Sequence, residues 1–455
     1  MQRVSQVLTR LDVAFDDPKS VASAGLLLPM SLAQRLNIEP VIDAALTSRG
    51  YGGHRNSGAK ALTMVSSLLA GGEFISDVGM LGSGATGRVL GHATVSASRC
   101  GQWLRQLTSG DTVGFERVNT DLIASAWHAG LGPGSFPDSG VGDRGRLVLD
   151  IDSTVIQTYG NLKEGTSKRN YRGIRGYHPL IVAEAGSGQV VSARLRDGNA
   201  APARDAAVFL DDTFSGIAQS VAAAHETVLR GDSGFYTKAV IDTCIAHDVR
   251  FSITIRQQAP VRDLIATIDH DSYKTVPSTG SQQFAVAEIP YTVKGRTTNN
   301  PVPCRLIVRR TTVPADTGDP QPRLFDLVEY RGFVTDLDGD AKDLDRFHRQ
   351  HAVIETVIRD LKHGMALNHM PSGNYHANAG WLQLNILAHN LARWTGRLIS
   401  DKPITTKTLR HRYLNCPGRI TRNSRRHVLH LPTNWPWKNE YATALTRIRT
   451  LQTAD

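Results

Sequence analysis

Cysteine is scarce in this chain, and its few cysteines lie far apart. Cys100, Cys244, Cys304 and Cys416 include no C-x-x-C pair. Zinc ribbons and disulfide-stapled scaffolds both need closely spaced cysteines, so the sequence indicates neither. A reducing compartment fits this pattern.

Long hydrophobic runs are also missing. No stretch of about 18 apolar residues occurs, and the start MQRVSQVLTRLDVAFDD lacks the apolar core of a signal peptide. We therefore expect a cytoplasmic protein with no membrane partner. The 16 histidines form no H-E-x-x-H motif, which argues against a zinc peptidase.

Positive charge is in excess. The 455 residues include 52 Lys and Arg against 42 Asp and Glu, which gives a net charge of +10. A polyanionic partner such as nucleic acid fits this balance. Many basic proteins bind no nucleic acid, however, so the motifs must decide.

The hydrophobic pattern divides the chain into five segments. Residues 1–140 are mostly helical and end in a linker rich in Gly, Pro and Ser. Residues 141–272 contain three strands, a helix, a strand, a helix and a strand, and residues 273–338 form an antiparallel β insertion. Residues 339–400 return to helices, and residues 401–455 are basic. This order predicts an α/β fold with a ribonuclease H-like mixed sheet, preceded by an all-α region and followed by C-terminal helices.

Two acids share one face of the first strand of the α/β segment. In LVLDID, Asp150 and Asp152 alternate with apolar residues and point the same way. A buried carboxylate without a partner costs several kcal/mol, so it needs a metal, a basic group or solvent. A metal site is one natural solution.

A further acid lies where a later strand gives way to a helix. Asp232 follows ETVLRG and precedes the helix that starts near Phe235. Strand ends are where α/β sheets place their sites. The alternative is that Asp232 only caps this helix.

A third acid lies on a helix predicted over residues 344–363. Its apolar stripe leaves a second, ionisable face at spacings of three and four. That face could contact metal and DNA, and it consists of His348, His351, Glu355, Arg359 and Lys362. The alternative is a solvated face with a Glu355–Arg359 ion pair.

Phosphodiester chemistry accounts for a set of three carboxylates. Two Mg²⁺ or Mn²⁺ ions about 3.5–4 Å apart can activate a nucleophile and stabilise the leaving oxygen. Magnesium prefers hard oxygen ligands and keeps several waters, so a few Asp and Glu side chains suffice.

Several strings together resemble the DDE transposases of bacterial insertion sequences, in the IS4-like group and most closely the IS1380 family. The likeness rests on LDIDSTVIQTYG, GYHPLIVAEA, LRGDSGFY, HAVIETVIRDLKHGMAL and ANAGWLQLNILAHNLARW, and continues into GRITRNSRRHVLHLPTNWPW. It spans nearly the whole chain.

The resemblance implies a site. The first acid is the Asp before Ser-Thr, Asp152, with Asp150 in reserve; the others are Asp232 and Glu355. A Tyr, Arg, Glu and Lys signature of related enzymes maps to His348, His351, Glu355 and Lys362. Glu and Lys match and the first two positions do not, so Arg349 or Arg359 are possible substitutes for the phosphate contacts.

Two basic segments are candidates for binding DNA. A loop after the first strand carries Lys168, Arg169, Arg172 and Arg175 among glycines and tyrosines. The C-terminal segment carries Arg422, Arg425 and Arg426. The alternatives are a solvated loop and a basic surface that stabilises the fold.

The resemblance implies a bacterial, nucleoid-associated enzyme that acts on double-stranded DNA as a homodimer. It would bind terminal inverted repeats, cleave DNA with two metal ions and transfer the strand to a target. Two alternatives remain: a ribonuclease H-like nuclease without strand transfer, and a catalytically silent, transposase-derived DNA-binding protein.

Overall fold

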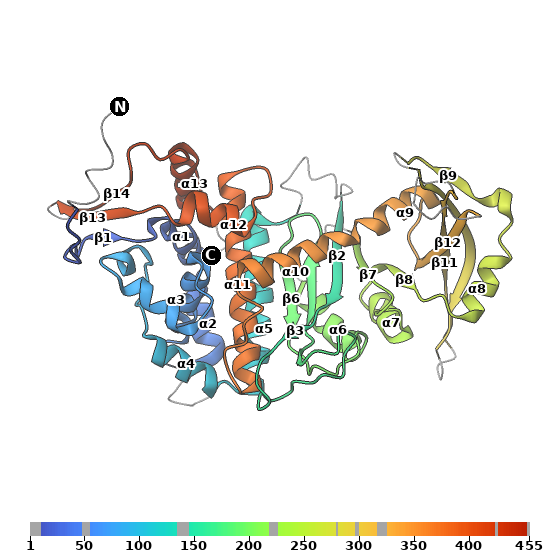
Figure 1. The fold of residues 1–455 in the computed structure, drawn as a ribbon, viewed down its shortest axis with the longest axis horizontal. Coiled ribbons are helices and arrows are strands. Elements are labelled where there is room, and N and C mark those ends of the chain that lie inside the picture. Colours follow the sequence, from blue (N-terminus) through green and yellow to red (C-terminus); the bar gives the residue numbers. More distant parts are fainter. Residues whose placement is uncertain are drawn as a thin grey trace.

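The computed structural model describes residues 11–47, 55–133, 145–217, 226–278, 281–295, 300–315, 325–423 and 426–452. Helices and strands alternate along these residues, and most of the strands join one large mixed sheet, so the mixed α/β class is confirmed. Figure 1 shows the helical end of the molecule on the left, with the sheet running from the middle to the β-rich end on the right.

One mixed sheet of nine strands organises the molecule. Among the described strands, the only parallel neighbours are β2 with β7 and β7 with β8. In spatial order the strands are β6 (Val190–Arg194), β5 (Leu180–Glu184), β2 (Arg146–Ser153), β7 (Glu226–Gly231), β8 (Arg250–Ile255), β12 (Leu327–Thr335), β11 (Val302–Val313), β10 (Gln283–Val293) and β9 (Lys274–Val276). Because β2 and β7 are parallel neighbours, the residues that follow them lie at the same edge of the sheet.

The predicted β insertion extends this sheet. Strands β9 to β12 pair antiparallel, and β12 pairs with β8, with Gly332 opposite Ile255. The crossovers of the central part are α6 (Ala206–Ile217) and α7 (Lys238–Ala246), and α8 (Ala259–Ala266) follows β8. The insertion is therefore continuous with the sheet that carries the candidate acids.

A helical layer covers the other end of the molecule. It contains α1 (Leu27–Arg35), α2 (Ile38–Thr47), α3 (Ser57–Ala70), α4 (Ala97–Gln106) and α5 (Ser109–Ala126). Helix α11 (Tyr375–Ile399) runs between this layer and the sheet, and it contacts α3, α4, α5 and β6. Almost the whole of α11 is buried.

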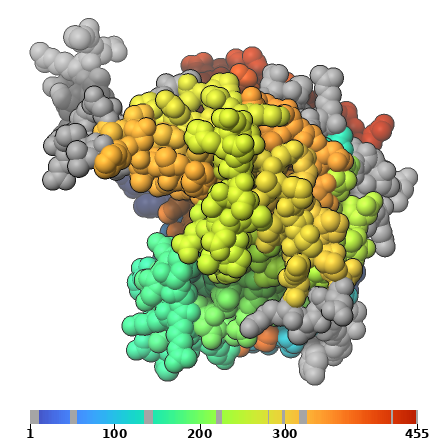
Figure 2. Space-filling view, turned by 90° about the vertical axis from the view of Figure 1, so that its right-hand side faces the viewer, coloured from blue at the N-terminus to red at the C-terminus, as the bar shows by residue number. Residues whose placement is uncertain are grey.

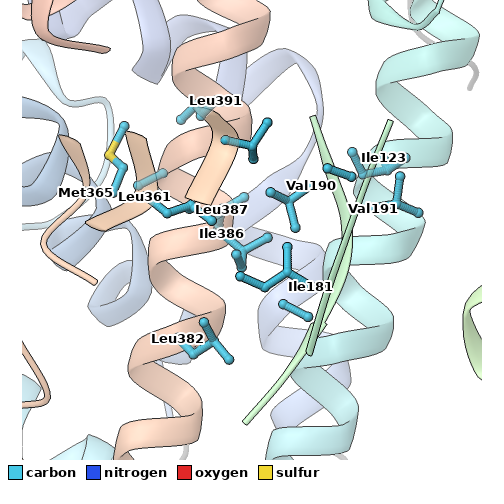
Figure 3. Close-up of a cluster of buried hydrophobic side chains, with 14 of the residues drawn as sticks. Ile123, Ile181, Val190, Val191, Leu361, Met365, Leu382, Ile386, Leu387 and Leu391 are labelled. Carbon is cyan, nitrogen blue, oxygen red and sulfur yellow. The ribbon is translucent and has the colours of Figure 1, made fainter. Parts of the chain in front are cut away.

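The core is continuous from the helical layer to the sheet. Figure 3 shows Leu382 and Ile386 of α11 facing Ile181 and Val190 of the sheet, with Ile123 of α5 beyond them. Burial from both sides explains why apolar residues occur all round α11, between its buried polar side chains.

The C-terminal segment folds back on the N-terminal helices. Strand β1 (Ser20–Val21) pairs with β13 (Gly418–Asn423), which pairs with β14 (Arg426–His430). The short helix α12 (Thr406–Leu409) packs on α11, and α13 (Lys438–Thr450) packs on both α1 and α11.

The helix predicted over residues 344–363 is broken. Helix α9 (Ala341–Arg349) ends in a 3₁₀ turn at Gln350–Ala352, and α10 (Val353–Gly364) follows. Hydrogen bonds before and within the turn hold it, because His348 bonds to β8 and His351 bonds to β2. The spacing rule for one continuous helix therefore does not apply across it.

No single helix of the described ranges is both long and apolar enough to cross a membrane. Helix α3 and the 3₁₀ helix Ile75–Gly82 meet that test only together, across a bend of 88°.

Candidate active site

The three predicted acids line one cavity. Asp152 lies near the end of β2, Asp232 directly follows β7, and Glu355 lies in the first turn of α10. The strand register places Ile151 opposite Gly231, so the two aspartates are neighbours at one sheet edge. Both, with Glu355, line a cavity of about 830 Å³.

The pKa of Asp152 reflects the closeness of the other two acids. Burial, with the nearby carboxylates of Asp232 and Glu355, raises the pKa of Asp152 to about 6. The Ser153 backbone N–H, 2.6 Å from the Asp152 carboxylate, opposes the shift. A cation in the cavity would relieve the repulsion.

Asp232 does not cap the helix that follows it. Its carboxylate accepts from the Gly234 N–H at 2.8 Å in the loop after β7. Helix α7 starts later, at Lys238, and Thr237 caps it by accepting from the Val240 N–H. The side chain of Asp232 is exposed to the cavity.

Asp150 is buried and hydrogen-bonded inside the protein. Arg230 donates two hydrogen bonds to its carboxylate, at 2.8 and 2.9 Å, and His351 Nδ1 lies 3.0 Å away. The side chains of Asp150 and Arg230 are 1% and 0% exposed. Asp152 is therefore the acid of β2 that faces the cavity, and the alternation pattern alone could not separate the two.

The residues predicted to share one ionisable face of the helix over residues 344–363 do not lie together. Arg359 donates to Thr356 Oγ1 at 2.9 Å and lines a different cavity, of about 740 Å³, with Thr356 and Asp360. Among the described side chains, no ion pair joins Arg359 to Glu355. The Glu355–Arg359 pair considered from the sequence is thus not formed.

Both histidines of this segment are used within the fold. His348 bonds to Ser252 and Thr254 through its two ring nitrogens, at 2.8 and 2.9 Å, and its ring stacks on Phe333. Burial lowers the pKa of His348 to about 3, so it is neutral. With both nitrogens occupied and no charge, His348 is not placed to bind a phosphate, and His351 already binds Asp150.

Lys362 lies beside the cavity. Its Nζ donates to Thr154 Oγ1 at 2.6 Å and to the Val155 carbonyl at 3.1 Å, in the segment directly after β2. Burial lowers the pKa of Lys362, and the charge of Arg172 adds to this effect. Lys362 thus ties α10 to the end of the strand that carries Asp152.

The basic loop after β2 borders the same cavity. Arg169 and Tyr171 line it, and Arg172 is near enough to Lys362 to lower its pKa. Lys168 is exposed, whereas Arg175 is half-buried with Nη1 3.4 Å from Thr166 Oγ1. In Figure 2 this part of the chain, in turquoise-green, projects from the lower side of the molecule.

The remaining predicted DNA-binding residues lie elsewhere. Arg349 borders a cavity of about 500 Å³ on the β extension, together with Arg309 and Arg331. Arg422 and Arg426 are exposed on β13 and β14. Arg425 lies outside the described residues.

Sequence reasoning missed several residues of the site. His178, Asn199 and Arg256 line the cavity, and Arg230 neutralises Asp150. His178 stands in the string GYHPLIV and Arg230 directly before Gly-Asp. Their roles depend on packing between distant segments, which no local pattern indicates.

The donor chemistry of the cavity suits magnesium or manganese. Asp152, Asp232 and Glu355 offer only hard oxygen ligands, and their repulsion is the kind a divalent cation relieves. Across the described part of the chain, no three His, Cys, Asp or Glu side chains are grouped tightly enough to enclose an ion by themselves. Magnesium usually takes one or two carboxylates, with water and substrate phosphate completing its shell.

Comparisons with known proteins identify a family. No curated protein sequence matches the chain. Among solved structures, a piggyBac transposase synaptic complex with hairpin DNA is similar at a TM-score of 0.42 and 11% identity, covering 87% of this chain and 78% of that one. The family described as transposase DDE domain group 1 matches residues 8–453. The chain therefore belongs to the DDE transposase domain family, group 1.

Proposed function

We propose that this protein is the transposase of an insertion sequence, which cleaves DNA at the ends of its element and joins them to a target. The observation that carries the proposal is the convergence of Asp152, Asp232 and Glu355, from three separate segments, on one open cavity. The basic loop with Arg169 at its rim gives the cavity the charge that a DNA backbone needs.

Each acid has a distinct part in this proposal. Asp152 and Asp232, at adjacent strand ends, and Glu355, from α10, would hold the metal. Divalent ions bound there would supply Lewis-acid activation of the attacking oxygen and stabilisation of the leaving oxygen. Lys362 orients the segment after Asp152 and adds positive charge beside the scissile phosphate.

Further features support finer assignments. The strand order β6-β5-β2-β7-β8, with only the last three parallel, supports a ribonuclease H-like catalytic domain. The motifs around the three acids support the IS1380 group of insertion sequences. We further propose that the enzyme works as a homodimer on double-stranded DNA, in the bacterial cytoplasm at the nucleoid.

The test is a reaction in Mg²⁺ with duplexes that carry the sequences bordering the coding region, plus a target plasmid. We expect cleaved ends and joined products. Cuts without joining would instead identify a nuclease, and DNA binding without either product would identify a silent binding protein.

Matched variants test the site in the same assay. Asp152→Asn, Asp232→Asn and Glu355→Gln should each lower product formation about a hundredfold or more, because each removes a charged ligand. Asp263→Asn, an exposed acid on α8, is the control and should react like the parent protein. Normal strand transfer by Asp232→Asn or Glu355→Gln would overturn the site.

A further inference from the structure

Strands β13 and β14 form a two-stranded ribbon far from the cavity. β14 is the edge of its three-stranded sheet, and within the described ranges it pairs only with β13. Figure 1 shows the ribbon at the end of the molecule opposite β9 to β12. The side chains on one of its two faces are exposed and available to a partner.

The two faces of the ribbon differ. The inner face is anchored, because Ile420 is buried and its pairing partner Leu429 packs against the main core. The outer face is polar and basic, and its paired residues are Arg419 with His430, Thr421 with Val428 and Asn423 with Arg426. All of these except the half-buried Thr421 are exposed.

The C-terminal segment that contains the ribbon carries charge of one sign. No Asp or Glu occurs between Asp401 and Glu440, while this stretch carries many Lys and Arg. An acid from the other end of the chain, Asp17, lies 3.3 Å from Arg419 in an exposed ion pair. Such exposed pairs contribute little, so a phosphate can replace Asp17 as the partner of Arg419.

We propose that the outer face of the β13–β14 ribbon binds duplex DNA in the major groove, away from the scissile bond. This inference rests on the proposed function. A two-stranded ribbon fits the width of that groove. Arg and Asn are the side chains that bond to base edges and phosphates there, and Val428 offers a methyl surface. The ribbon would thereby recognise an internal part of the element's end while the cavity acts on its terminus.

The experiment uses the full chain and labelled duplexes of about 30 base pairs, roughly three helical turns. One duplex carries the sequence bordering the coding region, and the other is its scrambled version. Binding is measured by fluorescence anisotropy over a salt series, and dimethyl sulfate protection reports guanine N7 in the major groove.

The double variant Arg419→Ala/Arg426→Ala should bind the natural duplex about tenfold more weakly, or worse. The slope of log affinity against log salt should fall by about one for each arginine that binds a phosphate. Guanine protection at the internal site should disappear. Arg117→Ala/Arg262→Ala, with two exposed arginines from α5 and α8, is the charge-matched control and should bind unchanged.

Unchanged binding and protection in the ribbon variant would overturn the proposal, and so would an equal loss in the control. Should the double variant fail to fold, the single Arg426→Glu change on the exposed edge strand provides the same comparison. A parent protein that protects the duplex through the ribbon but neither cuts nor joins it would refute the proposed chemistry alone. A parent that cuts and joins, with a ribbon variant that binds normally, would refute the ribbon alone.

Discussion

Two aspartates on one face of β2 have opposite environments. Asp152 faces two other carboxylates, and its pKa is raised to about 6, above the ordinary value near 3.9 of an unfolded chain. Folding therefore disfavours its charged form, and the protein loses stability as pH rises from about 4 to about 6. Asp150 is held by Arg230 and His351 instead.

These environments predict opposite stability effects for the same substitution. In the presence of a chelator at neutral pH, Asp152→Asn should raise the free energy of unfolding by about 1–2 kcal/mol, because it removes a repelled charge. Asp150→Asn should lower it by about 3 kcal/mol or more, because it leaves Arg230 buried with an unbalanced charge. Urea denaturation measures both.

The pairing of Asp150 with Arg230 supplies the control. In Asp150→Asn/Arg230→Met the buried charge is gone, so the decrease in stability should be smaller than the sum of the two single decreases. Additive decreases, or destabilisation by Asp152→Asn, would contradict the environments described for these acids.

At the scale of elements, the segment from α9 to α10 determines which of its ionisable side chains face the acids. Glu355 and Arg359 lie one turn apart within α10, yet Glu355 lines the cavity of the acids, whereas Arg359 donates to Thr356 and lines another cavity. The break serves the site, since His351 reaches β2 from the turn and α10 begins with Glu355 facing the acids.

The basic loop after β2 is the second element with a testable role. Arg169→Ala/Arg172→Ala should weaken DNA binding and lower the salt slope by about one for each phosphate that is no longer neutralised, because Arg169 lines the cavity and Arg172 lies near Lys362. Arg175→Ala, with a half-buried side chain directed at Thr166, should change the slope less. If the salt slope fell equally per substituted arginine in the double variant and in Arg175→Ala, only net charge would matter.

At the scale of the whole molecule, α11 joins the helical layer to the sheet. Its Gln383 accepts a hydrogen bond from Asn119 of α5 at 2.8 Å, and its Asn390 bonds to both backbone groups of Val190 in β6. The N-terminal helices thus share their core with a helix that comes over 240 residues later in the chain.

This shared core predicts that the N-terminal region does not fold alone. A fragment of residues 11–133 should show no cooperative thermal transition by circular dichroism, because the apolar faces that α11 covers would be exposed. The same fragment joined by a flexible linker to residues 375–399 should regain one. A cooperative transition in the short fragment would show that the helices form an independent domain.

The sequence by itself determined the element types, the acids at two strand ends and on a helix, and the excess of positive charge, because these depend on local periodicity and composition. Only the tertiary structure decided which aspartate of β2 is free for a ligand, since Arg230 reaches Asp150 from 80 residues away. It also decided that His348 and Arg359 lie apart from the acids, because His348 bonds to β8 and Arg359 bonds to Thr356 at a different cavity. Local patterns place side chains on faces of elements, and the partners that neutralise or occupy those side chains come from elsewhere in the chain.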